Sequence, residues 1–296
     1  MTTERVRVAR HDGPSLQVLG EGGATTAALK PGVEAVPGDW AFVEDGVVVG
    51  IAPRTGVLRC RGHDGTEQLL AANVDLVLAV CGLDRPLRAG RLHRTAALAW
   101  DAGAVPVVVL TKADVGEDAE EAAEAAAAAL PGCDVHVVAA SSGAGIDELR
   151  AAVAGRATVL VGESGAGKST LVNALVGADV AATGAVREGD AKGRHTTTRR
   201  ELYELPGGGV LLDSPGIRAV GLWVDADAVD AVFPDIEELA EQCRFGDCNH
   251  TGEPGCAVVE GADPGRLAAW QELRREVESV ERTEHERRRD GRKAAG

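Results

Sequence analysis

The sequence has 296 residues and a formal net charge of −15. Its apolar runs are shorter than the roughly 18 residues that a membrane-spanning helix needs, and its first residues lack the apolar core of a signal peptide. We therefore expect a cytoplasmic protein that does not contact a membrane. The acidic balance argues against attraction of the whole molecule to nucleic acid, so any contact with RNA would need a local basic patch.

The length allows two or three domains, and the cysteine spacing does not suggest a disulfide framework. Three of the six cysteines lie close together beside a histidine, which indicates a metal site. The other three, Cys60, Cys81 and Cys133, lie in apolar stretches, and we expect them to be inert residues of the core.

The N-terminal region consists of short apolar and alternating runs separated by glycine and proline. Runs of this kind are Val47–Ile51 and Val57–Cys60, and typical breaks are Pro37–Asp39 and Asp45-Gly46. Short strands with turns at this spacing predict a small β-barrel of the OB or SH3-like kind. We place this domain at residues 1–68.

The pattern then changes, and continuous apolar strands alternate with helices. The expected strands are 74–80, 105–110, 135–138, 157–161 and 210–213, and the expected helices are 87–102, 117–130, 146–153 and 170–176. Such alternation is typical of a parallel sheet with helices packed on its faces. The predicted α/β domain covers residues 69–225.

The remaining chain, residues 226–296, is expected to be helical and charged, with the cluster of cysteines inside it. Its last stretch, residues 266–293, has the pattern of a charged amphipathic helix. The basic end of that helix, Arg287–Lys293, is interpreted as a solvated helix terminus, with contact to nucleic acid as the alternative.

The segment Gly162–Ser169 matches the phosphate-loop pattern G-x-x-x-x-G-K-S/T, between a predicted strand and a predicted helix. Its glycines allow backbone N–H groups to turn toward phosphates at the positive end of a helix. Lys168 is expected to reach the β- and γ-phosphates, and the Ser169 hydroxyl to hold Mg²⁺. The residues expected at the nucleotide are Gly162, Glu163, Ser164, Gly165, Ala166, Gly167, Lys168, Ser169 and Thr170.

A second motif, Thr111-Lys112-Ala113-Asp114, ends a predicted strand with the pattern T-K-x-D. In GTP-binding proteins this pattern lies beside the base, where the Asp carboxylate accepts two hydrogen bonds that guanine offers and adenine does not. Thr111 replaces the commoner Asn, and we expect a weaker bracing hydrogen bond there. Ser141 and Ser142 follow the next strand and are expected at the guanine O6. The predicted nucleotide is therefore GTP or GDP.

A third motif, Asp213-Ser-Pro-Gly216, matches D-x-x-G at the end of a predicted strand. We expect Asp213 to lie near Mg²⁺ and the Gly216 N–H group to face the γ-phosphate. The polar loop Gly193–Thr198 comes between this motif and the phosphate loop. Thr196 or Thr197 is expected to complete the Mg²⁺ shell and to sense the γ-phosphate.

Intrinsic hydrolysis is expected to be slow. Ras-type enzymes orient the attacking water with a Gln just after D-x-x-G, and Ile217 stands at that position here. His195 is the candidate for holding the water, because imidazole does so at neutral pH; the alternative is that it only braces its loop. The catalytic candidates are His195, Lys168, Thr196 and Thr197.

The order of these motifs differs from that of ordinary GTPases, in which the phosphate loop comes first. Here the base motif Thr111–Asp114 precedes the phosphate loop Gly162–Ser169. This order indicates a circular permutation, which preserves the packing of a domain whose termini lie close together. It also lets the segment after Gly216 continue directly into the C-terminal domain.

The cysteine cluster, Cys243-x₄-Cys248-x-His250-x₅-Cys256, offers three thiolates and one imidazole. This donor set is suited to one tetrahedral Zn²⁺ per chain, and four protein ligands leave no open position. We therefore expect a structural rather than a catalytic zinc site.

The motif order, the barrel-like front and the Cys/His cluster resemble the ribosome small subunit-dependent GTPase A family, also called RsgA or YjeQ. The resemblance covers nearly the whole chain and includes Arg54-x₄-Arg59 and Ala71–Asp75. It implies an OB-fold RNA-binding domain, a circularly permuted GTPase domain and a helical zinc-binding domain. It further implies a GTP hydrolase that binds the small ribosomal subunit and its rRNA, assists late maturation and is stimulated by the subunit.

Two other functions fit parts of the sequence. One is a nucleotide-gated rRNA-binding module in which hydrolysis is incidental; the other is a P-loop kinase, against which Asp114 and the D-x-x-G motif argue. We expect a monomer that uses local arginines for RNA. The candidates for this contact are Arg5, Arg7, Arg10 and Arg287–Arg289.

Overall fold

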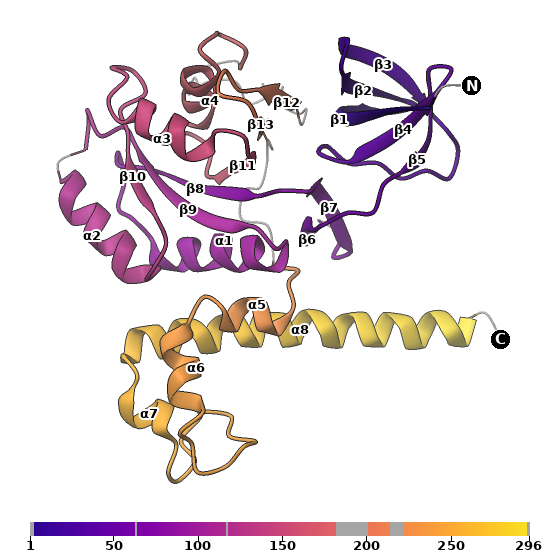
Figure 1. The fold of residues 1–296 in the computed structure, drawn as a ribbon. Coiled ribbons are helices and arrows are strands. Elements are labelled where there is room, and N and C mark those ends of the chain that lie inside the picture. The colour runs from indigo at the N-terminus through magenta and orange to yellow at the C-terminus, as the bar shows by residue number, and fades with distance from the viewer. Residues whose placement is uncertain (1–2, 63, 117, 182–200, 214–221, 295–296) are drawn as a thin grey trace, which may run out of the picture.

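The computed structural model describes residues 3–62, 64–116, 118–181, 201–213 and 222–294. It contains an N-terminal β-barrel, a central sheet covered by helices, and a C-terminal group of helices that ends in one long helix (Figure 1). This arrangement confirms the predicted fold class. None of the described helices is both long and apolar enough to cross a membrane.

The N-terminal barrel has five strands: β1 (Glu4–Asp12), β2 (Ser15–Gly20), β3 (Gly23–Leu29), β4 (Trp40–Glu44) and β5 (Val47–Ile51). The strands close in the order β1-β2-β3-β5-β4, with β3 and β5 parallel. Alternate side chains such as Val6, Val8 and Leu16 fill the interior, as the period of two along a strand requires. The turn between β4 and β5 has positive φ at both Asp45 and Gly46, the geometry that joins two antiparallel strands tightly.

The next two strands, β6 (Val57–Arg61) and β7 (Glu67–Ala72), form a separate hairpin. The run Val57–Cys60 was predicted to be a strand of the barrel, and this prediction was wrong. The barrel is already closed by five strands, so it offers no free edge to a sixth. Leu58, Cys60 and Leu70 instead pack into the apolar core that continues under the central sheet.

The central sheet has the strand order β10-β9-β8-β11-β13-β12. Its strands are β8 (Leu76–Gly82), β9 (Val105–Thr111), β10 (Val135–Val137), β11 (Ala157–Gly162), β12 (Glu201–Glu204) and β13 (Val210–Asp213). All neighbouring pairs are parallel except the edge pair β12 and β13, and β12 was not predicted. The four central strands β9, β8, β11 and β13 are buried on both faces, which explains their continuous apolar runs.

Four helices cover this sheet: α1 (Ala89–Asp101), α2 (Ala119–Ala129), α3 (Ile146–Val153) and α4 (Lys168–Val176). Helices α1 and α2 share one apolar core with one face of the sheet, whereas α3 and α4 share a second core with the other face. The parallel strands and these helices confirm the predicted α/β alternation.

The C-terminal helices are α5 (Ala226–Asp230), α6 (Pro234–Ala240), α7 (Ala257–Gly261) and α8 (Pro264–Ala294). Helix α8 runs beneath α1 and extends past the β6–β7 hairpin (Figure 1). Trp270, Leu273 and Val277 of α8 are buried in the core that contains α1. Near its far end, the Arg287 guanidinium donates hydrogen bonds to the carbonyl oxygens of Gly65 and Asp64, at 2.7 and 3.1 Å.

Candidate functional site

The carboxyl ends of the parallel strands bring three motifs to one edge of the sheet. The phosphate loop follows β11, the T-K-x-D motif follows β9, and Asp213 ends β13. Strand β8 separates the first two, pairing Gly162 with Val80 and Gly82 with Thr111. This edge is where parallel α/β sheets bind their ligands.

The phosphate loop has the backbone that its glycines were expected to permit. Gly165 and Gly167 have φ of 79° and 87°, in the left-handed region that favours glycine. A Cβ atom on Gly162 would lie 2.3 Å from the carbonyl oxygen of Val80, so no other residue fits there without movement. Helix α4 begins at Lys168, within the motif, which places the positive end of the helix dipole at the phosphate loop.

Lys168 folds back over the loop. Its Nζ donates hydrogen bonds to the carbonyl oxygens of Gly162 and Glu163, both at 2.6 Å. Ser169 beside it is half-buried, and Asp213 on the neighbouring strand is 4% exposed. The Lys168 amine, the Ser169 hydroxyl and the Asp213 carboxylate thus lie on adjoining elements at this edge of the sheet.

The base motif is tied directly to the phosphate loop. The Thr111 hydroxyl is buried and donates a hydrogen bond of 2.5 Å to the carbonyl oxygen of Ala166. Thr111 therefore supplies a bracing hydrogen bond between the two motifs in place of the commoner Asn. Asp114, at the exposed end of the motif, accepts a hydrogen bond of 2.5 Å from the Ser141 hydroxyl. The structure thus brings together the residues predicted around the base.

Sequence reasoning missed Asp84, which lies in the loop after β8. Its carboxylate pairs with the Lys112 amine at 2.7 Å and with the Arg85 guanidinium at 3.2 Å. Hydrogen bonds from Arg85 and Lys112 lower the pKa of Asp84 to about 2. Asp84 therefore stays ionised and fixes the Lys112 side chain, whose backbone has the uncommon φ of 62°. The only signal in the sequence was a carboxylate just after a buried strand.

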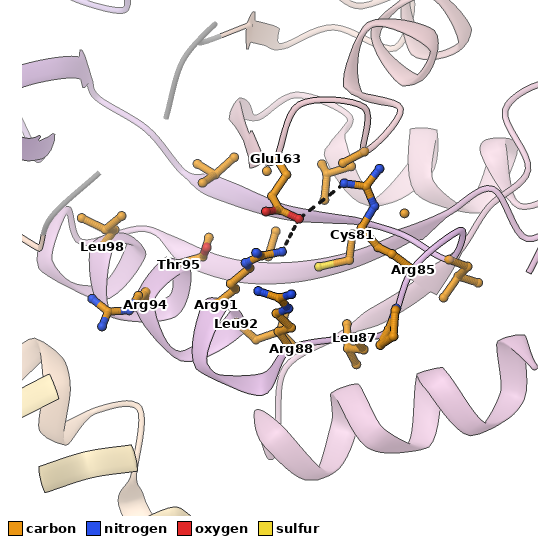
Figure 2. Close-up of a pocket in the computed structure, with 18 of the residues that line it drawn as sticks. Cys81, Arg85, Leu87, Arg88, Arg91, Leu92, Arg94, Thr95, Leu98 and Glu163 are labelled. Carbon is orange, nitrogen blue, oxygen red and sulfur yellow. Dashed lines mark ion pairs between the residues drawn. The ribbon is translucent and has the colours of Figure 1, made fainter. Parts of the chain in front are cut away.

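A second unpredicted interaction involves the side chain of Glu163 in the phosphate loop. Figure 2 shows its carboxylate between the guanidinium groups of Arg85 and Arg91. The Arg85 pair spans 3.7 Å. Arg91 lies on α1, so the phosphate loop is joined to the helix that follows β8 in the chain.

Several predicted site residues lie outside the described part of the chain. They are His195, Thr196, Thr197, the rest of the loop Gly193–Thr198, Gly216 and Ile217. Their predicted roles at the γ-phosphate and the attacking water stay predictions.

The four residues of the Cys/His cluster converge, with their ligand atoms all within 4.8 Å of one another. The sulfur atoms of Cys243 and Cys256 are 3.9 Å apart, and they lie 3.6 and 3.5 Å from His250 Nδ1. Ligand atoms at the corners of a tetrahedral zinc site are about 3.5–3.8 Å apart when bonds to sulfur are about 2.3 Å and bonds to nitrogen about 2.0 Å. The cluster therefore has the size and donor set of a tetrahedral metal site.

The loop that carries the cluster is held by contacts with α8 and by its own hydrogen bonds. His250 is buried with a φ of 56°. Its ring packs against the Trp270 ring in a tilted arrangement at a centroid distance of 5.5 Å, and its carbonyl accepts a hydrogen bond from Gln271 Nε2 at 2.8 Å. The Glu253 carboxylate accepts from the backbone N–H groups of Asn249, Thr251 and Gly252. Hydrogen bonds from its own and neighbouring N–H groups lower the pKa of Glu253 to about 2.

The phosphate loop follows β11, and the base motif follows β9, which comes earlier in the chain and belongs to the same sheet. This order of motifs defines a circularly permuted P-loop domain. The sequence model of the RsgA GTPase family matches residues 51–223. The small ribosomal subunit biogenesis GTPase RsgA of Streptomyces avermitilis is 45% identical over 294 residues, covering 93% of this chain and 80% of that protein. The protein of the same name from Streptomyces coelicolor is 47% identical over 257 residues, covering 82% of this chain and 70% of that protein. The chain belongs to the RsgA GTPase family.

Solved structures show the same fold at lower identity. YjeQ from Thermotoga maritima has a TM-score of 0.70 and 22% identity, covering 93% of this chain and 99% of that one. YloQ, described as a circularly permuted GTPase, has a TM-score of 0.68 and 21% identity, covering 94% and 96%. The similarity extends across the barrel, the central sheet and the C-terminal helices, because these shares leave little of either chain unmatched.

Proposed function

We propose that this protein is a GTP hydrolase that binds the small ribosomal subunit and assists its late maturation, with turnover stimulated by the subunit. The Streptomyces relatives are named for small ribosomal subunit biogenesis. The observation that carries the proposal is the hydrogen bond from Thr111 to Ala166, because it joins a guanine-type base motif to a phosphate loop in one site.

Asp114 is proposed to accept hydrogen bonds from guanine N1–H and the 2-amino group. The Ser141 hydroxyl supports this role, since its hydrogen bond orients the carboxylate. Lys112, fixed by Asp84, would lay its apolar stem along the base, and Ala113 and Ser142 would border it. An unpaired carboxylate at the base is costly, so this arrangement discriminates against adenine.

The phosphates are proposed to lie in the loop Gly162–Ser169, with Lys168 exchanging its carbonyl partners for phosphate oxygens. The Ser169 hydroxyl and the Asp213 carboxylate are oxygen donors of the kind that Mg²⁺ prefers, and they would hold it directly or through water. Bound Mg²⁺ would neutralise charge on the β- and γ-phosphates. Their positions support this role, because Ser169 lies at the start of α4, which follows β11, and Asp213 ends β13, which pairs with β11 up to Leu160 and Asp213.

Hydrolysis is proposed to need His195 for positioning the attacking water, with Thr196 or Thr197 and Gly216 at the γ-phosphate. An ordinary imidazole titrates near neutral pH and can hold a water molecule. His195→Ala should leave GTP affinity nearly unchanged and remove most of the subunit-stimulated turnover. Full stimulation in this variant would place the water on another group.

The Cys/His cluster is proposed to bind one structural Zn²⁺ per chain through Cys243, Cys248, His250 and Cys256. The convergence of their ligand atoms within 4.8 Å of one another supports this choice, and a complete set of protein ligands leaves no position for a substrate.

The N-terminal domain (proposed as residues 1–68, with the barrel strands at Glu4–Ile51) and the C-terminal helices (proposed domain 226–296) are proposed to contact rRNA on either side of the GTPase domain (69–225) in a monomer. Of the arginines predicted for this contact on the barrel, only Arg5 is exposed, and it lies 4.5 Å above the Trp40 ring. Arg7 donates to the carbonyl of Asn73, and Arg10 pairs with Asp12. Burial lowers the pKa of Arg7, which indicates a structural role.

One steady-state assay tests the proposal. GTP hydrolysis should rise when small ribosomal subunits are added to the protein, should not rise with large subunits, and should be lost in Lys168→Ala. Co-sedimentation should show tighter binding of the GTP form than of the GDP form. Unstimulated hydrolysis together with nucleotide-dependent binding would favour the alternative, a nucleotide-gated rRNA-binding module.

A further inference from the structure

A cavity of about 340 Å³ lies on the α1 side of the phosphate loop. Figure 2 shows it between the end of β8, the start of α1 and the first residues of the loop. Its described lining includes Gly162, Glu163 and Ala166 of the phosphate loop, but not Lys168 or Ser169. The cavity therefore adjoins the phosphate loop but does not include Lys168 or Ser169, the two side chains proposed to hold phosphate and Mg²⁺.

The cavity has an apolar floor and a cationic rim. The floor is formed by Cys81, Leu83, Leu87, Leu92 and Leu98. The rim carries Arg85, Arg88 at the N-cap of α1, and Arg91 and Arg94 of α1. A spacing of three residues places the side chains of Arg91 and Arg94 at neighbouring positions on one face of the helix. These four residues are a cluster of arginines in a chain with a net charge of −15.

Carboxylates pair with three of these four arginines. Arg85 pairs with Asp84 and Glu163, Arg91 pairs with Glu163, and Arg94 pairs with Glu272 and Glu276 of α8. No described carboxylate pairs with Arg88, which is exposed at the start of α1. The rim thus retains positive charge directly above an apolar surface.

We propose that this cavity binds a small organic anion: a carboxylate, sulfonate or phosphate ester attached to an apolar body of one or two rings. Its volume lies within the range of small-molecule sites, about 300–1,000 Å³. The charged head would bind Arg88 and Arg91, since guanidinium groups bind such oxyanions through paired hydrogen bonds. The apolar body would contact Leu83, Leu87 and Leu92.

Such a ligand would also act on the phosphate loop. Its head group competes with the Glu163 carboxylate for Arg91, and the Glu163 carbonyl is one of the two groups that hold Lys168. The ligand should therefore change the affinity for GDP, and by linkage GDP should change the affinity for the ligand by the same factor. The binding itself does not depend on the proposed GTPase function.

The test uses the full chain and two matched fluorescent probes, anilinonaphthalene sulfonate and the uncharged N-phenylnaphthylamine. We expect saturable binding of one sulfonate per chain, at least about tenfold tighter than binding of the uncharged probe. One charge-assisted hydrogen bond is enough to give this difference in affinity. Arg88→Ser should remove most of this preference, whereas Arg282→Ser, an exposed arginine of α8, should retain it. Equal affinity of the two probes for the unmodified protein would overturn the proposal without requiring any variant.

The position of the probe is checked at Cys81 in the cavity floor. Saturating sulfonate should slow modification of Cys81 by N-ethylmaleimide several-fold, measured by peptide mass spectrometry, and should leave Cys133 unaffected. Burial raises the pKa of the Cys81 thiol to about 11, so the reaction needs long exposure to the reagent. Unchanged modification of Cys81 at saturation would place the probe elsewhere and contradict the proposed site.

Discussion

At the scale of single residues, the nucleotide site depends on polar contacts between segments that are far apart in the chain. Thr111 binds Ala166, Ser141 binds Asp114, and Asp84 binds Lys112. Each contact joins the loop after one strand to the loop after another. A change at one residue therefore alters two motifs at once.

Asp114→Asn should shift nucleotide preference from guanine toward xanthine. The amide of Asn offers a hydrogen-bond donor to the 2-oxo group of xanthine, whereas the carboxylate of Asp accepts from the 2-amino group of guanine. Competition between XTP and GTP for the variant measures the shift. Ser15→Ala, a change at a barrel residue, should leave the preference for GTP intact. An unchanged preference in Asp114→Asn would remove Asp114 from the base site.

Thr111→Val should lower the free energy of unfolding by about 1–2 kcal/mol and weaken GDP binding. Valine keeps the shape of threonine but leaves the buried carbonyl of Ala166 without its short hydrogen bond. Urea denaturation measures the first effect and isothermal titration the second. Thr26→Val, at an exposed position of β3, is the matched control and should change neither. If Thr111→Val changed neither the free energy of unfolding nor the affinity for GDP, the hydrogen bond would not brace the phosphate loop.

The sequence predicted Thr111, Asp114 and Lys168 because each belongs to a short motif with a fixed spacing. It did not predict Asp84 or Arg91, since their partners, Lys112 and Glu163, come close only after β8, β9 and β11 pair. Contacts between separate motifs carry no local pattern in a single sequence.

At the scale of elements, periodicity predicted the buried parallel strands and most helices. It failed for the β6–β7 hairpin, because the alternation in Val57–Cys60 is the same whether the apolar face packs in the barrel or against α1. It also missed β12, a four-residue edge strand. Which surface covers a strand is decided by sheet closure and register, which the local sequence does not specify.

The metal-binding loop is an element whose order is expected to depend on its ion. Cys248→Ser should lose about one zinc per chain and make the segment 243–256 sensitive to protease, because structural zinc contributes roughly 10–16 kcal/mol to small zinc domains. Metal analysis and limited proteolysis measure the two effects. Cys133→Ser, a cysteine outside the cluster, should retain both zinc and protection. A zinc-free chain with this segment protected would contradict the prediction.

At the scale of the whole molecule, Arg59 connects three parts of the chain. Its guanidinium donates to Asp101 at the end of α1 at 2.7 and 2.9 Å, and to Asp225 before α5 at 3.0 Å. The backbone N–H of Asp225 also donates to Asp101. The β6–β7 hairpin, the central domain and the C-terminal helices thus meet at the carboxylate of Asp101, whose side chain is 2% exposed.

Arg59→Ala should lower the free energy of unfolding by about 3 kcal/mol, because it leaves the buried carboxylate of Asp101 without its charged partner. Hydrogen bonds to Asp101 raise the pKa of Arg59, so the arginine is charged throughout the accessible pH range. Urea denaturation provides the measurement, and Arg61→Ala in the same strand is the control. Equal stability of the two variants would mean that Asp101 finds another partner.

The single apolar core beneath the sheet also determines when the protein can finish folding. It contains Leu92 of α1 together with Leu273 and Val277 of α8. Since synthesis proceeds at about 5–20 residues per second, α8 is made roughly 10–40 s after α1. Throughout that interval the outer face of α1 lacks its cover on the growing chain. Closure of the core must therefore follow the emergence of α8 from the ribosome, and a nascent chain stalled before α8 should bind chaperones that recognise exposed apolar surface.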